Sequence, residues 1–194
     1  MAEPSLFLVR HGTTPWVRAG RHTGASDIPL DADGEAQARA VGDRLRGHHF
    51  AAVLVSPLVR ARRTCELAGF GAVAEVHDGL REWDYGDYEG RTTPEIRETD
   101  PGWTIWKGGA PGGESVDEVA DRVRRVIADA VEHDGDVLLF GHGHSLRVLA
   151  ACWIALDPLA GKVLGLDAGS ISVLGSEREV RVIRLWNDVG AVPA

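Results

Sequence analysis

The stretch Ser5-Leu6-Phe7-Leu8-Val9-Arg10-His11-Gly12-Thr13-Thr14 decides the fold class. Its apolar run has no polar alternation, which is typical of a strand buried on both faces of a parallel sheet. The run stops at an arginine, a histidine and a glycine, and open α/β sheets bind ligands at the carboxyl ends of their strands. Gly12 lets the backbone turn sharply and a ligand come close. We expect Arg10-His11-Gly12 to organise a ligand site, although a lone triplet also fits a histidine that merely caps a strand.

A second buried-strand run ends in the same way. Asp136-Val137-Leu138-Leu139-Phe140 is followed by Gly141-His142-Gly143-His144. In a parallel sheet the carboxyl ends of the strands share one edge, so the two runs deliver histidine and glycine to the same place. The pattern therefore predicts that His11 and His142 meet.

The rest of the chain alternates strands with helices. The predicted strands cover residues 51–55, 72–77, 171–174 and 180–185, the last two forming a hairpin around Ser176-Glu177-Arg178. The predicted helices run from a cap at Asp33 to about Arg46, from Ser56-Pro57 onward, from a Ser115/Glu118 capping box to about Glu132, and from about His144 to Ala155. Alternation of this kind predicts an α/β fold, a three-layer α-β-α sandwich with a mostly parallel central sheet. A length of 194 residues suits one domain over 1–194.

Composition narrows the function classes. A net charge of -8 argues against a nucleic-acid surface. The N-terminus has no basic segment or signal-peptide core, and no apolar run is long enough to span a membrane, so we expect a cytoplasmic protein. The two cysteines, Cys65 and Cys152, sit among apolar neighbours in predicted helices and are expected to be free thiols.

Two further segments leave alternatives open. Arg60 lies in the first turn of the helix after Pro57, where a helix N-terminus and an arginine would suit an anion, but the run Arg60-Ala61-Arg62-Arg63 also fits a solvated basic face. Residues 84–112 are acidic, aromatic and glycine-punctuated. This excursion is expected either to cover the site as a lid or to be a packed surface insertion whose tryptophans belong to the core.

Four blocks, taken in order, resemble the histidine phosphatase superfamily, also called phosphoglycerate mutase-like. They are Arg10-His11-Gly12-Thr13-Thr14, the run from Ser56 to Thr64, Glu82 ahead of Tyr85-Gly86-Asp87-Tyr88-Glu89-Gly90, and Gly141-His142-Gly143. The resemblance covers nearly the whole chain. The amino-acid sequences of residues 80–90 and 142–147 most resemble the branch that contains sedoheptulose-1,7-bisphosphatase and broad acid phosphatases.

The resemblance implies a site and a mechanism. His11 is expected to attack phosphorus and become a phosphohistidine, while Arg10, Arg60 and His142 stabilise the phosphoryl oxygens. Glu82 is expected to protonate the leaving oxygen and then activate water, and the adjacent apolar Trp83 predicts a raised pKa for its carboxyl group. The remaining predicted substrate-binding residues are Gly12, Thr14, Thr23, Gly24, Tyr85, Gly143, His144 and Arg147. No cofactor and no metal are expected.

The function expected from these residues is that of a phosphomonoesterase acting on small phosphorylated metabolites such as sugar phosphates. The alternative is a phosphoglycerate mutase, which is disfavoured because Val17 stands where many mutases carry asparagine and because the excursion after Glu82 is short. A zinc hydrolase using His48-His49 or His142 and His144 is a weaker alternative, since arginines beside the ligands repel cations. A non-catalytic binding module is another, and a homo-oligomer is left open.

Overall fold

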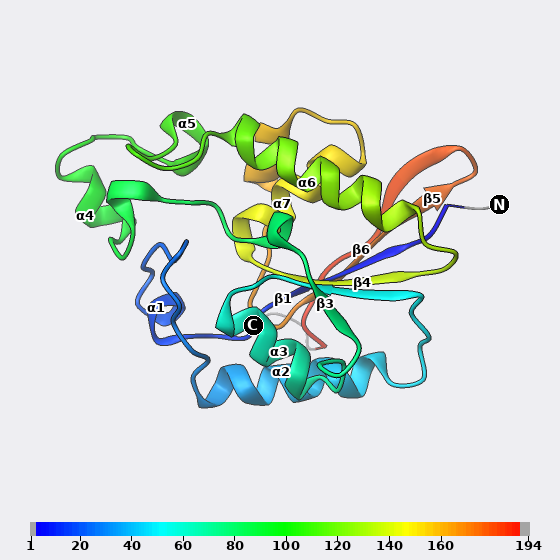
Figure 1. Ribbon diagram of the computed structural model, residues 1–194. Coiled ribbons are helices and arrows are strands. Elements are labelled where there is room, and N and C mark those ends of the chain that lie inside the picture. Colours follow the sequence, from blue (N-terminus) through cyan, green and yellow to red (C-terminus); the bar gives the residue numbers. More distant parts are fainter. Residues whose placement is uncertain (1–2, 191–194) are drawn as a thin grey trace.

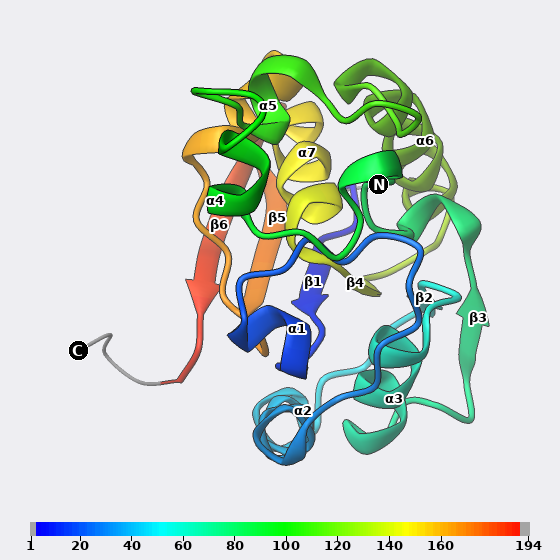
Figure 2. The ribbon, with the colours of Figure 1, turned by 90° about the vertical axis from the view of Figure 1, so that its left-hand side faces the viewer.

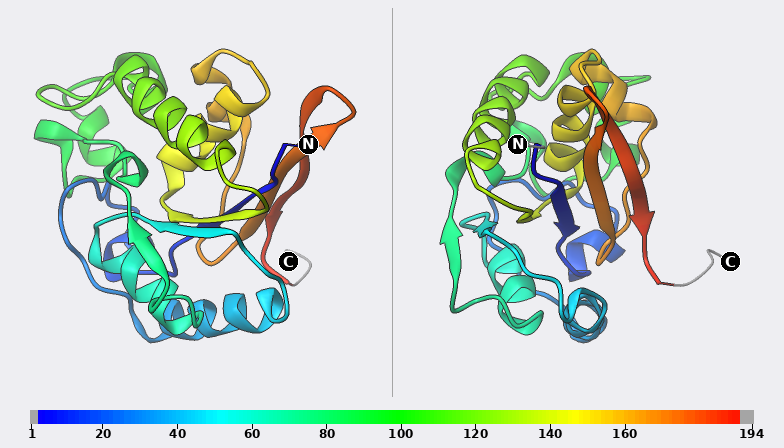
Figure 3. Two further views of the ribbon diagram at one scale, coloured as in Figure 1. Left: turned by 45° about the vertical axis from the view of Figure 1, so that its right-hand side comes forward. Right: turned by 90° about the vertical axis from the view of Figure 1, so that its right-hand side faces the viewer.

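The computed structural model describes residues 3–190, and its centre is one six-stranded sheet (Figure 1). The strands are β1 (Leu6–Arg10), β2 (Ala52–Val55), β3 (Ala74–Val76), β4 (Val137–Gly141), β5 (Ile171–Glu177) and β6 (Val180–Asp188). Their spatial order is β3-β2-β4-β1-β5-β6; the first four strands are parallel, β5 is antiparallel to β1, and β6 is antiparallel to β5. The predicted mostly parallel sheet is confirmed, and Figure 3 shows the β5–β6 hairpin at the edge opposite β3.

Helices cover both faces of the sheet, as predicted. The helices are α1 (Pro15–Arg18), α2 (Ala32–Leu45), α3 (Val59–Leu67), α4 (Thr93–Arg97), α5 (Ile105–Gly108), α6 (Val116–Val131) and α7 (Gly143–Trp153), with 3-10 turns η1 (Asp78–Leu80), η2 (Gly86–Tyr88) and η3 (Pro158–Val163). Figure 2 shows α6 and α7 on one face and α2 and α3 on the other. Each face buries its own apolar cluster. Strand β4, which lies between β2 and β1, is buried throughout because helices cover both of its faces.

Local sequence signals account for most helix boundaries, with two corrections. The capping box of Ser115 and Glu118 begins α6, as predicted. The cap of α2, however, is Asp31, whose carboxylate accepts from the Gly34 N–H, and not Asp33. Helix α3 begins at Val59, beyond Pro57, and the Asp27 carboxylate accepts from the Val59 N–H in its first turn. The hairpin turn also lies slightly later than predicted, at residues 178–179.

The excursion over residues 84–112 is folded against the body of the protein. Its two short helices, α4 and α5, bury Ile96 and Ile105, and the Trp103 side chain is only 4% exposed. The loop around α1 lies beside it at one end of the molecule (Figure 1), joined by backbone hydrogen bonds from the His22 N–H to the Arg91 carbonyl and from the Gly90 N–H to the His22 carbonyl. These contacts favour the packed insertion, and lid motion stays a prediction.

Within the described residues no helix is both long and apolar enough to cross a membrane. Cys65 and Cys152 are free thiols, as expected from the sequence, and burial raises the pKa of the Cys65 thiol to about 12. Both positions lie in helices, Cys65 on α3 and Cys152 on α7. Neither thiol contributes to the site described next.

Candidate active site

The two histidines meet where β1 and β4 end. Arg10 is in register with Gly141, and the His11 N–H donates to the Gly141 carbonyl at 3.1 Å. The next residues along each strand are therefore side by side, and the His11 and His142 ring centroids lie 5.1 Å apart. The meeting predicted from two apolar runs separated by more than half of the chain is confirmed.

The His11 ring is held in the form that a nucleophile needs. Its Nδ1 lies 2.7 Å from the Gly12 carbonyl oxygen, which can only accept a hydrogen bond, so Nδ1 carries the proton and Nε2 carries the free lone pair. Burial, together with the positive charges of Arg60 and Arg10, holds the pKa of His11 well below its ordinary value. The ring is consequently neutral at neutral pH, with an oriented and unprotonated Nε2.

Arg10 and the start of α7 form an anion site next to His11. The Arg10 guanidinium lies against Gly143, where an added Cβ would make a tight contact of 3.3 Å with its Cζ. One guanidinium nitrogen donates to the Leu166 carbonyl, whereas the buried Nε has no partner in residues 3–190. A buried donor without a partner beside a helix N-terminus is favourable for a phosphoryl group.

Glu82 also lies at the start of α7. Its Oε1 accepts from the Trp83 N–H at 2.9 Å and the Ser145 N–H at 2.9 Å, and its Oε2 accepts from the His144 N–H at 3.1 Å. Burial alone would raise the pKa of Glu82, but the His144 ring and these three N–H groups lower it below its ordinary value. The raised pKa expected from Trp83 is wrong, because the carboxylate faces backbone donors and not the indole.

Arg60 and His142 support the site from behind. The Arg60 side chain is fully buried, and its Nε donates to the His142 Nδ1 at 3.1 Å. The His142 proton is therefore on Nε2, which donates to the Ser56 hydroxyl at 2.7 Å. The other two Arg60 nitrogens donate to the carbonyls of Thr23, Gly24 and Ser26, so this guanidinium fixes the loop over the site.

A cavity of about 180 Å³ opens beside His11. Eight of the thirteen predicted site residues line it: Arg10, His11, Thr23, Glu82, Tyr85, Gly143, His144 and Arg147. Five lining residues were not predicted: Val17, Gly20, Arg21, His22 and Leu166. Arg21 and His22 directly precede Thr23 and Gly24, two predicted substrate-binding residues, and this position in the sequence is the signal that indicates them.

The other five predicted residues do not line this cavity within residues 3–190. Arg60 and His142 lie behind it, as described above, and the remaining three make contacts within the protein, so their predicted substrate contacts stay predictions. Gly12 faces α2, since an added Cβ would come within 2.2 Å of the Gly34 carbonyl oxygen. Thr14 caps α1 by accepting from the Val17 N–H, and the Gly24 N–H donates to the Glu89 carboxylate.

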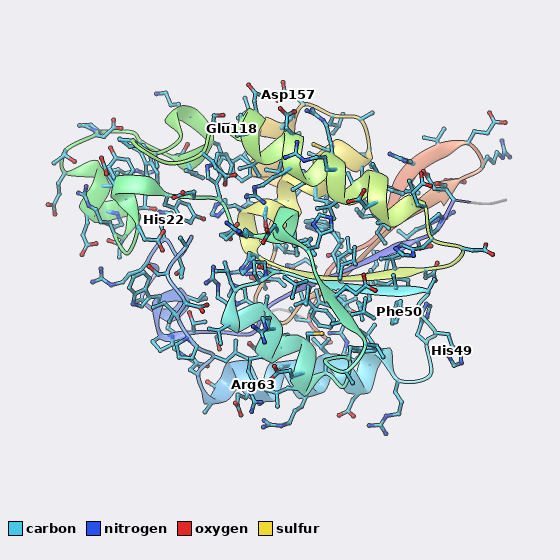
Figure 4. All side chains as sticks on the ribbon, viewed as in Figure 1. His22, His49, Phe50, Arg63, Glu118 and Asp157 are labelled. Atoms are coloured by element: carbon cyan, nitrogen blue, oxygen red, sulfur yellow. The ribbon has the colours of Figure 1, made fainter. Side chains whose placement is uncertain are left out.

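The far wall of the cavity consists of neutral polar rings. The Tyr85 hydroxyl and the His144 Nδ1 lie 2.7 Å apart, and the His22 ring centroid lies 4.9 Å from that of Tyr85. Burial lowers the pKa of His144 to about 4, lowers that of His22 and raises that of Tyr85 well above its ordinary value. Figure 4 shows His22 between the loop around α1 and the segment around α4. This wall offers hydrogen bonds without charge at neutral pH.

Arg147 contributes to the cavity rim while being tied elsewhere. Its Nε donates to the Gly161 carbonyl at 2.9 Å, one terminal nitrogen donates to the Lys162 carbonyl at 2.8 Å, and its Cζ stands 4.8 Å from the centre of the Trp106 ring.

Among residues 3–190, no group of three or more His, Cys, Asp or Glu side chains is arranged to hold a metal ion. The site thus brings together the neutral His11 imidazole, the Glu82 carboxylate and the Arg10 guanidinium, whose Nε lacks a partner among the described residues. This combination suits transfer of an anionic group.

Comparison with known proteins agrees with these features. The model of the histidine phosphatase superfamily, branch 1, matches residues 6–189. An acid phosphatase of Mycobacterium tuberculosis is 42% identical over 189 residues, covering 95% of this chain and 93% of that protein. Sedoheptulose 1,7-bisphosphatase of Saccharomyces cerevisiae is 35% identical over 185 residues, covering 79% of this chain and 68% of the enzyme.

Solved structures give the same answer at the level of the fold. A structure of an open reading frame from Mycobacterium tuberculosis superposes with a TM-score of 0.92 at 40% sequence identity, over 97% of this chain and 99% of that one. The family match extends from β1 to β6, and so includes every element that carries the site. With its paired strand-end histidines, the chain belongs to the histidine phosphatase superfamily, branch 1.

Proposed function

We propose that this protein is a phosphomonoesterase that hydrolyses small phosphorylated metabolites, sugar phosphates among them, through a phosphohistidine on His11. The observation that carries the proposal is the hydrogen bond from the His11 Nδ1 to the Gly12 carbonyl. It leaves the Nε2 lone pair free beside the unpartnered Arg10 Nε and the start of α7. A nucleophile and an oxyanion site are thereby adjacent, which is the requirement for phosphoryl transfer.

In the first step, the His11 Nε2 forms a bond to phosphorus as the bond from phosphorus to the ester oxygen breaks. Arg10 and the α7 N-terminus stabilise the charge on the three phosphoryl oxygens. The departing alkoxide takes a proton from the Glu82 carboxyl group and leaves as an alcohol. His142, held by Arg60 and Ser56, keeps its ring against His11 during this exchange.

Glu82 must gain its proton before it can act as an acid, because it is ionised in the free protein. A phosphate monoester has a second pKa of about 6 and so carries a proton to the site under mildly acidic conditions. The bound phosphoryl group and Glu82 share the start of α7, so their like charges raise the carboxyl pKa on binding. The proton of the substrate monoanion then moves to Glu82. The substrate reacts as a dianion, and Glu82 reacts as the protonated acid.

In the second step, water replaces the departed alcohol. The Glu82 carboxylate accepts a proton from the water as its oxygen bonds to phosphorus and the bond from phosphorus to Nε2 breaks. Inorganic phosphate leaves and the neutral His11 is restored. Water is the acceptor that we favour over a second metabolite, because Val17 gives this part of the cavity an apolar side chain.

The cavity and the relatives support a small, hydroxylated substrate. The volume of about 180 Å³ suits a phosphoryl group with only a few carbon atoms beyond it. His22, Tyr85 and His144 offer neutral hydrogen-bonding groups of the kind that bind sugar hydroxyls. The relatives named acid phosphatase and sedoheptulose 1,7-bisphosphatase are consistent with this substrate class.

The test is to trap the intermediate. Wild-type protein mixed with a labelled phosphate ester and quenched within one turnover should carry an acid-labile, base-stable phosphoryl group, and His11→Ala should carry none while keeping its fold. Circular dichroism of the variant serves as the control for folding. A label on serine or aspartate would refute the mechanism, and transfer of the label to a second metabolite in preference to water would identify a mutase.

A further inference from the structure

A partly buried ion pair holds the segment that carries Glu82. Arg122 projects from α6, is only 9% exposed, and uses all five guanidinium donors. Its Nε and one terminal nitrogen bind the two Glu114 carboxylate oxygens at 2.7 and 3.0 Å. The remaining contacts are to the carbonyls of Gly79, Arg81 and Glu82, at 2.9, 2.8 and 3.0 Å.

Glu114 closes this arrangement from the other side. Its Oε2 accepts from the Asp84 N–H at 2.9 Å, and its carbonyl accepts from the Trp83 indole N–H at 2.8 Å. Together, Arg122 and Glu114 bind the chain before, at and after Glu82. We call this pair the Arg122–Glu114 clamp.

The clamp sets the position of Glu82 relative to His11. The Glu82 carbonyl is held by Arg122 of α6, whereas its carboxylate is held by the first N–H groups of α7. The two helices pack on the same face of the sheet (Figure 2), so Glu82 is fixed at both ends by one rigid layer. A general acid must reach within hydrogen-bond distance of the leaving oxygen, and a misplacement of about 1 Å can cost 10²-fold in rate.

Stability alone does not account for the clamp. Where an ion pair is partly buried, the desolvation of its charges offsets much of their attraction, so the pair itself contributes little to stability. A planar guanidinium group that binds two carboxylate oxygens and three backbone carbonyls instead fixes the direction of the chain. The contacts converge on one short stretch of backbone, residues 79–84. Within this stretch, Glu82 is the residue that lines the active-site cavity.

We propose that Arg122, paired with Glu114, is a positioning residue that places Glu82 for proton transfer to the leaving group. The inference rests on the proposed phosphohistidine mechanism. Loss of the fork should impair the first step only where the leaving oxygen needs a proton. An alkyl phosphate should therefore be affected far more than an aryl phosphate.

The experiment compares Arg122→Lys with wild type in single-turnover phosphorylation by glycerol 3-phosphate and by 4-nitrophenyl phosphate. Lysine keeps the charge but cannot span the acceptors, so we expect a loss of about 10-fold or more with the first ester and of less than about 3-fold with the second. The matched control is Arg124→Lys, an exposed arginine on the same helix paired with Asp121, which should match wild type with both esters.

A double-mutant cycle separates positioning from stability. If Arg122 acts through Glu82, then adding Arg122→Lys to Glu82→Gln should cost less than about 2-fold further with glycerol 3-phosphate. Should Arg122→Lys fold poorly, Glu114→Gln tests the same clamp, because its amide would oppose the Asp84 N–H and Arg122, and the same ester selectivity is expected. Equal losses with both esters, or additive losses in the cycle, would overturn the inference.

The outcomes also distinguish this inference from the function on which it rests. If wild type forms no phosphohistidine, the proposed function fails and the inference fails with it. If the phosphohistidine forms and the clamp variants lose both esters equally, only the positioning role is refuted.

Discussion

Replacing Glu82 with glutamine tests the central step of the mechanism. The change removes the ionisable proton and keeps the size of the side chain. A sugar alkoxide must be protonated as it departs, whereas a nitrophenolate leaves unaided. We therefore expect phosphorylation of His11 by a sugar phosphate to fall by about 10²–10⁴-fold, and phosphorylation by 4-nitrophenyl phosphate to fall much less.

The structure also predicts a cost in stability. The glutamine oxygen can still accept from the Trp83 and Ser145 N–H groups, but its amide nitrogen would face the His144 N–H. One buried donor left without an acceptor costs about 1–3 kcal/mol. In a chain of this size each kcal/mol lowers Tm by about 2–4 °C, so the variant should melt several degrees below wild type at neutral pH.

The pH dependence of that cost has a definite sign. The pKa of Glu82 is lowered in the folded protein, so its ionised form stabilises the fold. This stabilisation is complete above the unfolded-state pKa of about 4.3 and is lost as the pH falls through the lower folded-state pKa. The difference in the free energy of unfolding between wild type and Glu82→Gln should therefore narrow at acidic pH.

The assay is a quenched-flow burst on both esters, which isolates phosphorylation from the later attack of water. The control is Asp78→Asn, an exposed carboxylate nearby that pairs with Arg81, and it should leave both bursts unchanged. Equal losses on the two esters would assign Glu82 to positioning of the substrate and not to proton transfer. Asp84 and Asp87 would then be the next acids to test.

Three further predictions follow from the same geometry. Arg60→Ala should lower turnover by about 10²-fold or more, because His142 and the 23–26 loop lose their support. Arg63 lies on the outer side of α3 (Figure 4) and pairs with Glu35, so turnover by Arg63→Ala should stay within about 2-fold of wild type. Equal effects of the two changes would contradict this assignment. The kcat/KM for a sugar phosphate should decline above about pH 6, as the ester loses the proton that Glu82 needs, and a flat profile to pH 8 would refute the proposed proton transfer. Exhaustive chelation should leave turnover unchanged, and activity restored by zinc or magnesium would show a metal requirement.

The sequence was most informative where the signal is local. Apolar runs without alternation predict strands covered on both sides, and a parallel arrangement brings their carboxyl ends to one edge. That reasoning placed His11 beside His142, and the register of Arg10 with Gly141 confirms it. The capping box at Ser115 is equally local, because a hydroxyl and a carboxylate three residues apart satisfy each other's backbone donors.

The errors concern groups whose partners are distant in sequence. Glu82 was expected to respond to Trp83, its neighbour, but its pKa depends on the start of α7, about sixty residues later. At Gly12 the structure shows a close approach by Gly34 of α2, whereas its contact with a ligand stays a prediction. Neither partner is indicated by periodicity or composition, because both arise only when the layers pack.

The start of α7 explains how one carboxylate can serve as both base and acid. A helix offers N–H groups without intrahelical partners in its first turn, and here Glu82 occupies those of His144 and Ser145 while Gly143 lies against Arg10. With the site empty, these donors favour the carboxylate. With a phosphoryl group bound at the same helix end, two anions compete for one set of donors, and the protonated carboxyl becomes favourable. In the proposed reaction, binding of the phosphoryl group therefore favours the protonated Glu82 that the first step requires. Transfer of that proton to the leaving alkoxide then leaves the carboxylate that accepts a proton from water in the second step.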